Sequence, residues 1–407
     1  MNPLGKVVRS IQEGSLYLLL VLLPFSKAAV EVLFGVLLLG WLIERARPET
    51  RRQTLWVRAE QRRLVWALGM FLAACALSVV VSGHRWLSLN GLINKWLEYL
   101  LFVVIVADVA SRPGVVTRCL MALSASVLLV GVEGLTQEFS GRGLLRHFPA
   151  RSVFGRMTGP YENPGDLATF LMVVIPLFMT VWMTVRGWKR FLVTVLLLTL
   201  MGCVVRTGTV GAWLGLGAGL VLVVTLNKRL RRFGVLTLAV LMLGAGIWSH
   251  RDGRLHNVRS PMQDIGVADR LYMWKAAMRM IQDRPLFGHG LNTFMSNYLS
   301  YWVGGERQPR YAHNCYLQMA AETGLVGLFF FVGLLVLLFV HLIRAARRLQ
   351  GNRRLILLGF VGGLFAFALQ AGVDTNFYSL RQAALFWTLA GLAVGLSARA
   401  VPETMTR

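Results

Sequence analysis

The residues with the clearest chemical use in this sequence are basic ones. Arg206 stands between two apolar stretches, where a charge is costly unless it is paired, reaches the membrane surface or has a function. The short turn around it favours a fixed donor aimed inward. Two polar stretches carry more basic residues: Arg142, Arg146, Arg151 and Arg156 in 135–165, and Arg251, Arg254, Arg259, Arg270, Lys275, Arg279, Arg284, Arg307 and Arg310 in 250–313. Because guanidinium matches phosphate oxygens, these sets indicate either an anion site or ordinary pairing with nearby acids.

His313 lies where the second polar stretch returns to an apolar segment. A neutral imidazole there can accept a proton from a hydroxyl group near neutral pH. Glu322 follows on the same predicted helix but about half a turn out of phase, so we expect it to bond to another helix instead. The sequence has no serine and acid at triad spacing and no CxxC or Cys/His pattern, so it predicts neither a hydrolase triad nor a zinc site.

The elements that must position these residues are apolar. Of the 407 residues, 56% belong to the apolar class and only 15% are charged, with apolar runs of membrane-spanning length. This composition indicates a polytopic membrane protein and excludes a soluble globular domain. Nucleic-acid binding is not expected either, because the 43 Lys and Arg residues are not gathered in one stripe.

The sequence therefore predicts an all-α polytopic membrane protein with about 12 transmembrane helices. The apolar segments are 13–26, 28–44, 64–82, 96–111, 114–134, 166–185, 191–206, 209–227, 233–249, 314–343, 355–373 and 382–399. We divide the chain into residues 1–249, with nine helices and a smaller outward loop at 135–165, a large outward loop at 250–313, and residues 314–407 with the last three helices. The first two segments are short and are expected to form a tight hairpin.

Basic residues also predict the orientation, because Lys and Arg are enriched in cytoplasmic loops. They gather after the second, fourth, sixth, eighth and tenth apolar segments, which all lie on one side by parity. Both termini are therefore predicted to be cytoplasmic, and the stretches 135–165 and 250–313 to face outward. Most of the net charge of +24 is then a topology signal and not a substrate signal.

The large outward loop is predicted to contain an amphipathic helix. Leu271, Trp274, Met278 and Ile281 recur at helical spacing and make an apolar stripe. Residues 260–264 resemble a helix start, and Arg284 followed by Pro285 and Gly288 resembles a helix end.

Four blocks of this sequence resemble signatures of the O-antigen ligase and polymerase superfamily. The residues 311–318 (YAHNCYLQ) and 322–327 (ETGLVG) are similar to its HNxYLQ and ExGxxG pattern, and 269–274 with 285–290 are similar to its RLxxW and PxxGxG pattern. The residues 206–208 with 211–215 resemble its SRGAWLG block, with Val205 in place of Ser. The residues 159–168 resemble its GxFxNPNxLA block, with Gly165 in place of Asn.

The resemblance implies a GT-C-type glycosyltransferase that uses a polyprenyl-diphosphate-linked glycan and neither a metal nor another cofactor. In the ligase branch the donor is undecaprenyl-diphosphate-linked O-antigen, and the acceptor is a sugar hydroxyl of the lipid A–core oligosaccharide at the periplasmic face of the bacterial inner membrane. On this chain Arg206 and Arg270 would hold the donor diphosphate, and His313 would activate the acceptor hydroxyl. Further substrate contacts are expected from Asn163, Trp274, Lys275, Arg279, His289, Asn314 and Tyr316. Membrane lipids are the other expected partners, and a monomer is expected.

Three alternatives stay open at this point. Two belong to the same superfamily: an O-antigen polymerase and a protein O-oligosaccharyltransferase. The third, a membrane transporter or flippase, would need acids near the middle of the membrane, and Glu31, Glu133 and Asp374 are the candidates.

Overall fold

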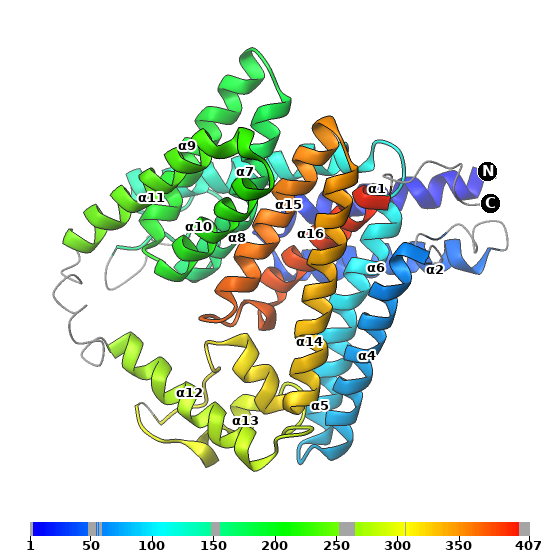
Figure 1. Ribbon diagram of the computed structural model, residues 1–407, viewed down its shortest axis with the longest axis vertical. Coiled ribbons are helices and arrows are strands. Elements are labelled where there is room, and N and C mark those ends of the chain that lie inside the picture. Colours follow the sequence, from blue (N-terminus) through cyan, green and yellow to red (C-terminus); the bar gives the residue numbers. More distant parts are fainter. Residues whose placement is uncertain are drawn as a thin grey trace.

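The computed structural model describes residues 3–47, 54, 56, 59–147, 155–251, 265–305 and 307–398. Within these ranges the regular structure is helical, as predicted (Figure 1). The helices are α1 (Pro3–Leu22), α2 (Lys27–Ala46), α4 (Ala59–Val81), α5 (Arg85–Gly91), α6 (Glu98–Ala110), α7 (Val115–Ser140), α8 (Pro164–Thr184), α9 (Trp188–Thr207), α10 (Val210–Leu226), α11 (Arg231–Arg251), α12 (Ile265–Asp283), α13 (Phe294–Tyr298), α14 (Cys315–Arg348), α15 (Gly351–Gln370) and α16 (Leu380–Ser397). Short 3-10 turns complete them, among them η7 (Asn376–Tyr378).

Each predicted apolar segment overlaps one of these helices, but fewer helices qualify as membrane spans. Seven described helices are long and apolar enough to cross a membrane: Gln61–Val81, Val115–Ser140, Pro164–Thr184, Trp188–Thr207, Cys315–Arg348, Gly351–Gln370 and Leu380–Ser397. The helices α1 and α2 fall short because they contain too many charged residues, and α6 is short because a π-helical turn, Leu92–Leu97, interrupts the helix before it. The structure supports a polytopic membrane protein, and the number twelve stays a prediction.

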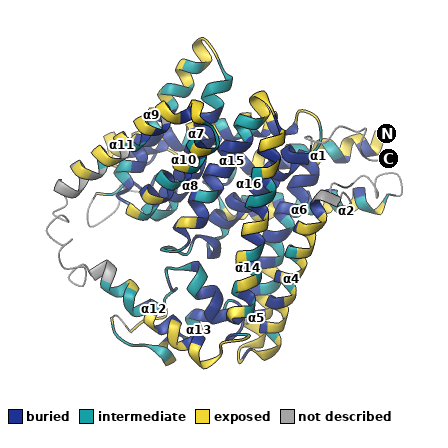
Figure 2. Cartoon of the chain, in the orientation of Figure 1, coloured by how far each residue is buried: buried dark blue, intermediate teal, exposed yellow. Residues whose placement is uncertain are grey.

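The centre of the molecule is formed by α8, α15 and α16, which are the most buried of the candidate spans (Figure 2). Glycines bring α10 against α15: a Cβ atom on Gly219 would lie 2.4 Å from the carbonyl oxygen of Gly362, and one on Gly215 would lie 2.9 Å from that of Ala366. Small residues let helix backbones approach closely, which is the usual basis of helix packing in membranes. The sequence block 211–215 thus serves helix packing.

The first two helices form the tight hairpin that their short apolar segments predict. Arg381 of α16 donates through Nη1 to the carbonyl oxygen of Pro24 over 2.9 Å, and Arg146 donates to that of Phe25. Two arginines from distant parts of the chain therefore hold the hairpin turn against the central helices.

The charges that disqualify α1 and α2 as simple spans are paired at the other end of the hairpin. Glu44 of α2 is 2% exposed and accepts a hydrogen bond at 2.6 Å from Nη2 of Arg112 and one at 2.8 Å from Nε of Arg9. The same Arg112 nitrogen lies 2.7 Å from Oε1 of Gln12. Since an unpaired buried carboxylate is strongly destabilising, this network fixes α1 and α2 to the turn between α6 and α7.

Helix α14 is broken near its beginning. Gly324 has φ +70° and ψ −178°, so the helical hydrogen bonds around it cannot form. The segment 285–290 supplies replacements: the N–H groups of His289 and Gly290 donate to the carbonyl oxygens of Ala321 and Glu322 over 3.1 Å and 2.8 Å. In the opposite direction, the N–H groups of 325 and 326 donate to the carbonyl oxygens of 285 and 286 over 2.7 Å and 3.4 Å. The segment 285–290 thereby satisfies backbone groups that the break exposes.

This exchange requires two backbones to touch, which explains the glycines at 288 and 324. A Cβ atom on Gly288 would lie 2.5 Å from the carbonyl oxygen of Glu322, and one on Gly324 would lie 2.0 Å from that of Leu286. Both glycines also have positive φ, a backbone conformation that residues with a Cβ atom rarely adopt. The position of the outward loop is therefore set by the break in α14.

We predict that Gly324→Ala destabilises the protein strongly. The positive φ alone costs about 1–3 kcal/mol, and the overlap with Leu286 adds to that cost. Thermal unfolding of the purified protein in detergent measures the change. Gly333→Ala is the matched control, because Gly333 lies on the same helix with no atom within 4 Å of an added Cβ. Equal unfolding temperatures for the two variants would contradict this account of the break.

Candidate active site

His313 lies directly before α14 and is held there by its neighbour. Asn314 caps the helix, because its Oδ1 accepts hydrogen bonds from the N–H groups of Tyr316 and Leu317 at 3.0 Å each. His313 itself has φ +46°, a left-handed conformation that is uncommon outside glycine. Its Nδ1 is buried without a hydrogen-bond partner, while the side chain as a whole is 40% exposed. The remainder of the imidazole ring is therefore open to a ligand.

Asp374 faces this histidine across 3.9 Å, measured from Oδ1 to the imidazole Nδ1. The carboxylate lies between α15 and α16 and accepts hydrogen bonds from the N–H of Thr375 at 2.7 Å and from Nε2 of Gln370 at 3.3 Å. The turn is also bonded to the start of α14, because the N–H of Cys315 donates to the carbonyl oxygen of Ala371 over 2.7 Å. A carboxylate at this position can orient the imidazole and stabilise it when it is protonated.

The block around Asn163 reaches the same place. Asn163 is the N-cap of α8, and its Oδ1 accepts a hydrogen bond at 2.8 Å from the N–H of Gly165. A Cβ atom on Gly165 would lie 3.7 Å from Oδ2 of Asp374. The N-terminus of α8 and the N-terminus of α14, which are far apart in sequence, therefore meet at Asp374.

Arg206 is in the last turn of α9 and forms an ion pair. Its Nε donates to Oε2 of Glu138 over 2.8 Å, and both side chains are more than a third exposed. The adjoining turn is held by Arg156, whose Nε and Nη2 donate to the carbonyl oxygen of Thr207 and the hydroxyl of Thr209 over 2.6 Å and 2.9 Å. Exposed ion pairs are worth about 0–1 kcal/mol, so an anionic ligand can compete for Arg206.

Arg270 is exposed on α12, and within the described ranges it has no hydrogen bond or ion pair. No hydrogen bond or ion pair in this part of the chain joins Arg206, Arg270 and His313 to one another either. The three residues remain a predicted set whose convergence on one substrate is a proposal.

The predicted amphipathic helix exists as α12 and ends at Asp283, next to the expected stop. Residues 260–264, which were expected to begin it, lie outside the described residues. The buried face matches the predicted apolar stripe only at Ile281, which is 8% exposed. The rest of that face is Met273, Ala276, Ala277 and Met280, which are at most 3% exposed and pack with Ala320 and Ala321. The alanines allow a closer approach to α14 than Trp274 or Met278 would allow, and close approach decides the rotation of the helix.

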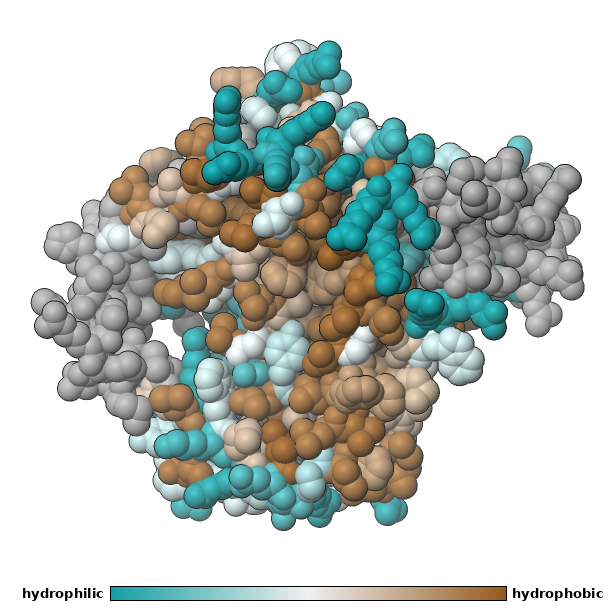
Figure 3. Space-filling model, viewed as in Figure 1, coloured by the Kyte–Doolittle hydropathy of each residue, from teal (hydrophilic) through white to brown (hydrophobic). Residues whose placement is uncertain are grey.

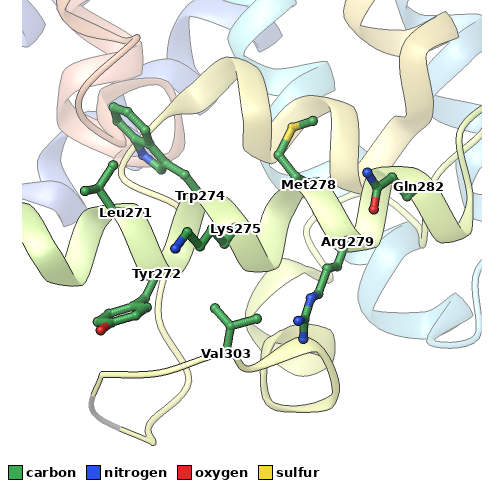
Figure 4. A pocket seen from close by; sticks show the side chains of 8 residues that line it. All are labelled: Leu271, Tyr272, Trp274, Lys275, Met278, Arg279, Gln282 and Val303. Atoms are coloured by element: carbon green, nitrogen blue, oxygen red, sulfur yellow. The ribbon is translucent and has the colours of Figure 1, made fainter.

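The side of α12 that faces away from the protein core lines a groove of about 520 Å³ (Figure 4). It includes three of the predicted substrate contacts, Trp274, Lys275 and Arg279, together with Tyr272 and Met278. Lys275 places its Nζ 5.9 Å from the centre of the Tyr272 ring. The groove is thus lined by aromatic, apolar and cationic side chains.

His289 and Tyr316, also predicted as substrate contacts, make contacts inside the protein. His289 is buried, its Nε2 lies 3.1 Å from the carbonyl oxygen of Met280, and burial lowers the pKa of its imidazole. Tyr316 donates through its hydroxyl to the carbonyl oxygen of Ala368 over 2.5 Å. These contacts give both residues a structural role, as the cap does for Asn314.

Glu322 does not pair with His313, as predicted, and it bonds to other helices: its partners include Phe294 at the start of α13 and Tyr378 of η7. The carboxylate is fully buried and accepts hydrogen bonds from the N–H groups of Asn292 and Phe294 at 2.7 Å and 3.2 Å. Nε2 of Gln318 and the hydroxyl of Tyr378 complete the set at 3.1 Å and 3.2 Å. Glu322 therefore joins the outward loop, α14 and η7.

No group of three or more His, Cys, Asp or Glu side chains is placed to hold a metal ion in the part of the chain that the structure describes. The polar groups near His313 are instead a carboxylate, amides and backbone groups. They suit hydrogen bonding to a hydroxyl group and positioning of a proton acceptor.

Comparison with known proteins shows which family part of this chain resembles. The model of the O-antigen ligase family matches residues 192–332, a segment that contains Arg206, Arg270 and His313. This match over about a third of the chain supports membership of the O-antigen ligase superfamily. A search of curated proteins found no match. The family match covers α9 to the first half of α14, so both sides of the α14 break fall within it.

We predict that Glu322→Gln destabilises the fold although it preserves shape. Each carboxylate oxygen accepts two hydrogen bonds, so an amide nitrogen in either position faces donors. A buried donor left unpaired costs about 1–3 kcal/mol. Thermal unfolding in detergent measures the loss, and Glu162→Gln, at an exposed position, is the control. An unchanged unfolding temperature would show that the carboxylate does not hold the loop.

Proposed function

We propose that the protein is an O-antigen ligase that completes lipopolysaccharide. It transfers a glycan from undecaprenyl diphosphate to a sugar hydroxyl of the lipid A–core oligosaccharide. The observation that carries the proposal is the O-antigen ligase match over 192–332, which includes all three residues expected to act on substrate.

In this proposal His313 takes the proton of the acceptor hydroxyl. The acceptor oxygen then bonds to the anomeric carbon of the donor sugar, the bond from that carbon to the diphosphate oxygen breaks, and undecaprenyl diphosphate leaves with the electron pair. The open imidazole face and the buried Nδ1 near Asp374 support this role, because the carboxylate would stabilise the imidazolium that forms.

Arg206 and Arg270 offset the negative charge that develops on the leaving diphosphate. Two features support them as ligands for an anion. Arg206 has only an exposed ion pair to give up, and Arg270 has no partner within the described residues. No metal ion or cofactor enters the proposed reaction.

We further propose that the protein is a multi-pass protein of the bacterial inner membrane that acts as a monomer of the GT-C class. Its termini lie in the cytoplasm and its active site faces the periplasm. The positions of the basic loops support this orientation. It also places the large outward loop, α12 and His313 on the side where lipid-linked glycans are used.

Deletion of the gene separates the ligase from its alternatives. For a ligase we expect lipid A–core without polymer, and polymer that accumulates on the carrier lipid. Attachment of one repeat unit to the core would identify a polymerase, and loss of glycan from glycoproteins would identify a protein O-oligosaccharyltransferase. Accumulation of carrier-linked glycan on the cytoplasmic side would identify a flippase.

We predict that Arg206→Ala, Arg270→Ala and His313→Ala each lower transfer by at least about 100-fold, the range found for lost proton acceptors and oxyanion donors. Asp374→Asn should lower it as well, because the imidazolium loses its charged neighbour. The assay uses purified protein with lipid-linked donor and lipid A–core. Arg186→Ala, at an exposed position outside the two predicted outward stretches, is the control. Normal transfer by His313→Ala at native abundance would refute its role as proton acceptor.

A further inference from the structure

Large apolar side chains are exposed on the side of α12 that faces away from the protein core. Met278 is 44% exposed, and Leu271 and Trp274 are only half-buried, although they form the apolar stripe of the helix. They line the groove of about 520 Å³ shown in Figure 4. An exposed apolar stripe on an amphipathic helix indicates a surface that is covered by something else.

The same face is positively charged. Arg270, Lys275 and Arg279 are exposed, and none has an ion pair within the described ranges. The two acids of α12 have other partners: Asp269 lies 3.0 Å from Nη1 of Arg310, and Asp283 accepts a hydrogen bond at 2.6 Å from the hydroxyl of Tyr301. The partner of this face is therefore expected to be both apolar and negatively charged.

The end of α12 lies beside the end of a candidate membrane span. Nη1 of Arg284 donates to the carbonyl oxygen of Val81, the last residue of α4, over 3.4 Å. Next to this contact Leu286 is 61% exposed, and Trp86 of the following helix is 79% exposed. In the space-filling view, hydrophobic residues cover α4 and the lower part of α14, and hydrophilic ones gather along the edge below (Figure 3). This pattern is typical of a membrane–water interface.

We propose that the exposed face of α12 lies on the non-cytoplasmic leaflet of the membrane and binds anionic phospholipids there. Leu271, Trp274 and Met278 enter the boundary between headgroups and acyl chains, and Lys275 and Arg279 reach the lipid phosphates. A helix of this kind gains its binding energy from apolar burial and from attraction to anionic lipid. It therefore responds to lipid charge and to salt, whether or not the protein transfers a glycan.

The test places a fluorescent probe on this face. The native cysteines Cys75, Cys119, Cys203 and Cys315 are all buried, so Met278→Cys provides the accessible thiol for an environment-sensitive label. The labelled full-length protein is reconstituted in vesicles of phosphatidylcholine alone or with one-third phosphatidylglycerol. In the anionic vesicles we expect blue-shifted emission, several-fold weaker quenching by iodide and quenching by lipids that carry a shallow spin label.

Two comparisons make the result specific. Raising salt from about 0.1 M to about 1 M shortens the screening length from about 10 Å to about 3 Å and should restore iodide quenching, as should the double variant Lys275→Gln/Arg279→Gln. A label at Gln308, exposed elsewhere in the outward loop, should behave alike in all vesicles. Equal iodide quenching of the two labelled sites in anionic vesicles would overturn the proposal. Protection of the Met278 site only after lipid-linked glycan is added would also overturn it and would assign the groove to the donor.

Discussion

The placement of the segment between α12 and α14 depends on backbone hydrogen bonds at the break in α14. Gly324 interrupts the helix, and the freed groups on both sides of it pair with the segment 285–290. Unpaired backbone groups near the hydrocarbon region are costly, so helix and loop cannot separate without loss of several such bonds. The buried carboxylate of Glu322 then accepts bonds from the next loop residues, 292 and 294, and from Tyr378. In this way one helical break positions α12, α13 and the turn that carries Asp374.

Charge in this chain is used in three separate ways. Basic residues in loops on one side indicate orientation, and the pairs around Glu44 fix α1 and α2 to the other helices. A third set is predicted to face outward and comprises Arg206, Arg270 and the other α12 cations, which have weak partners or none within the described residues. This third set lies within the segment that matches the O-antigen ligase family, and its availability suits an anionic ligand.

The sequence predicted helix positions well because burial in a membrane or a helical core is a local property of each segment. It predicted the end of α12 for the same reason, since Arg284 and Pro285 act on their own neighbourhood. It did not predict which side of α12 packs, because that depends on how closely Ala276 and Ala277 approach α14. Nor did it connect His313 with Asp374, because only the fold brings these two residues together.

The residues of the motif blocks can be sorted by the contacts that they make inside the protein. Asn163 and Asn314 each cap a helix through Oδ1, and Gly288 and Gly324 allow backbone contact, so these four residues help to shape the site. His313 differs, because its Nδ1 has no hydrogen bond although it is buried beside a carboxylate. Burial of an unpaired polar atom costs free energy, and folding alone gives no reason to keep it. A left-handed residue whose buried nitrogen faces Asp374 while the rest of its ring is exposed is therefore better explained by the proposed role of the imidazole as a proton acceptor than by stability.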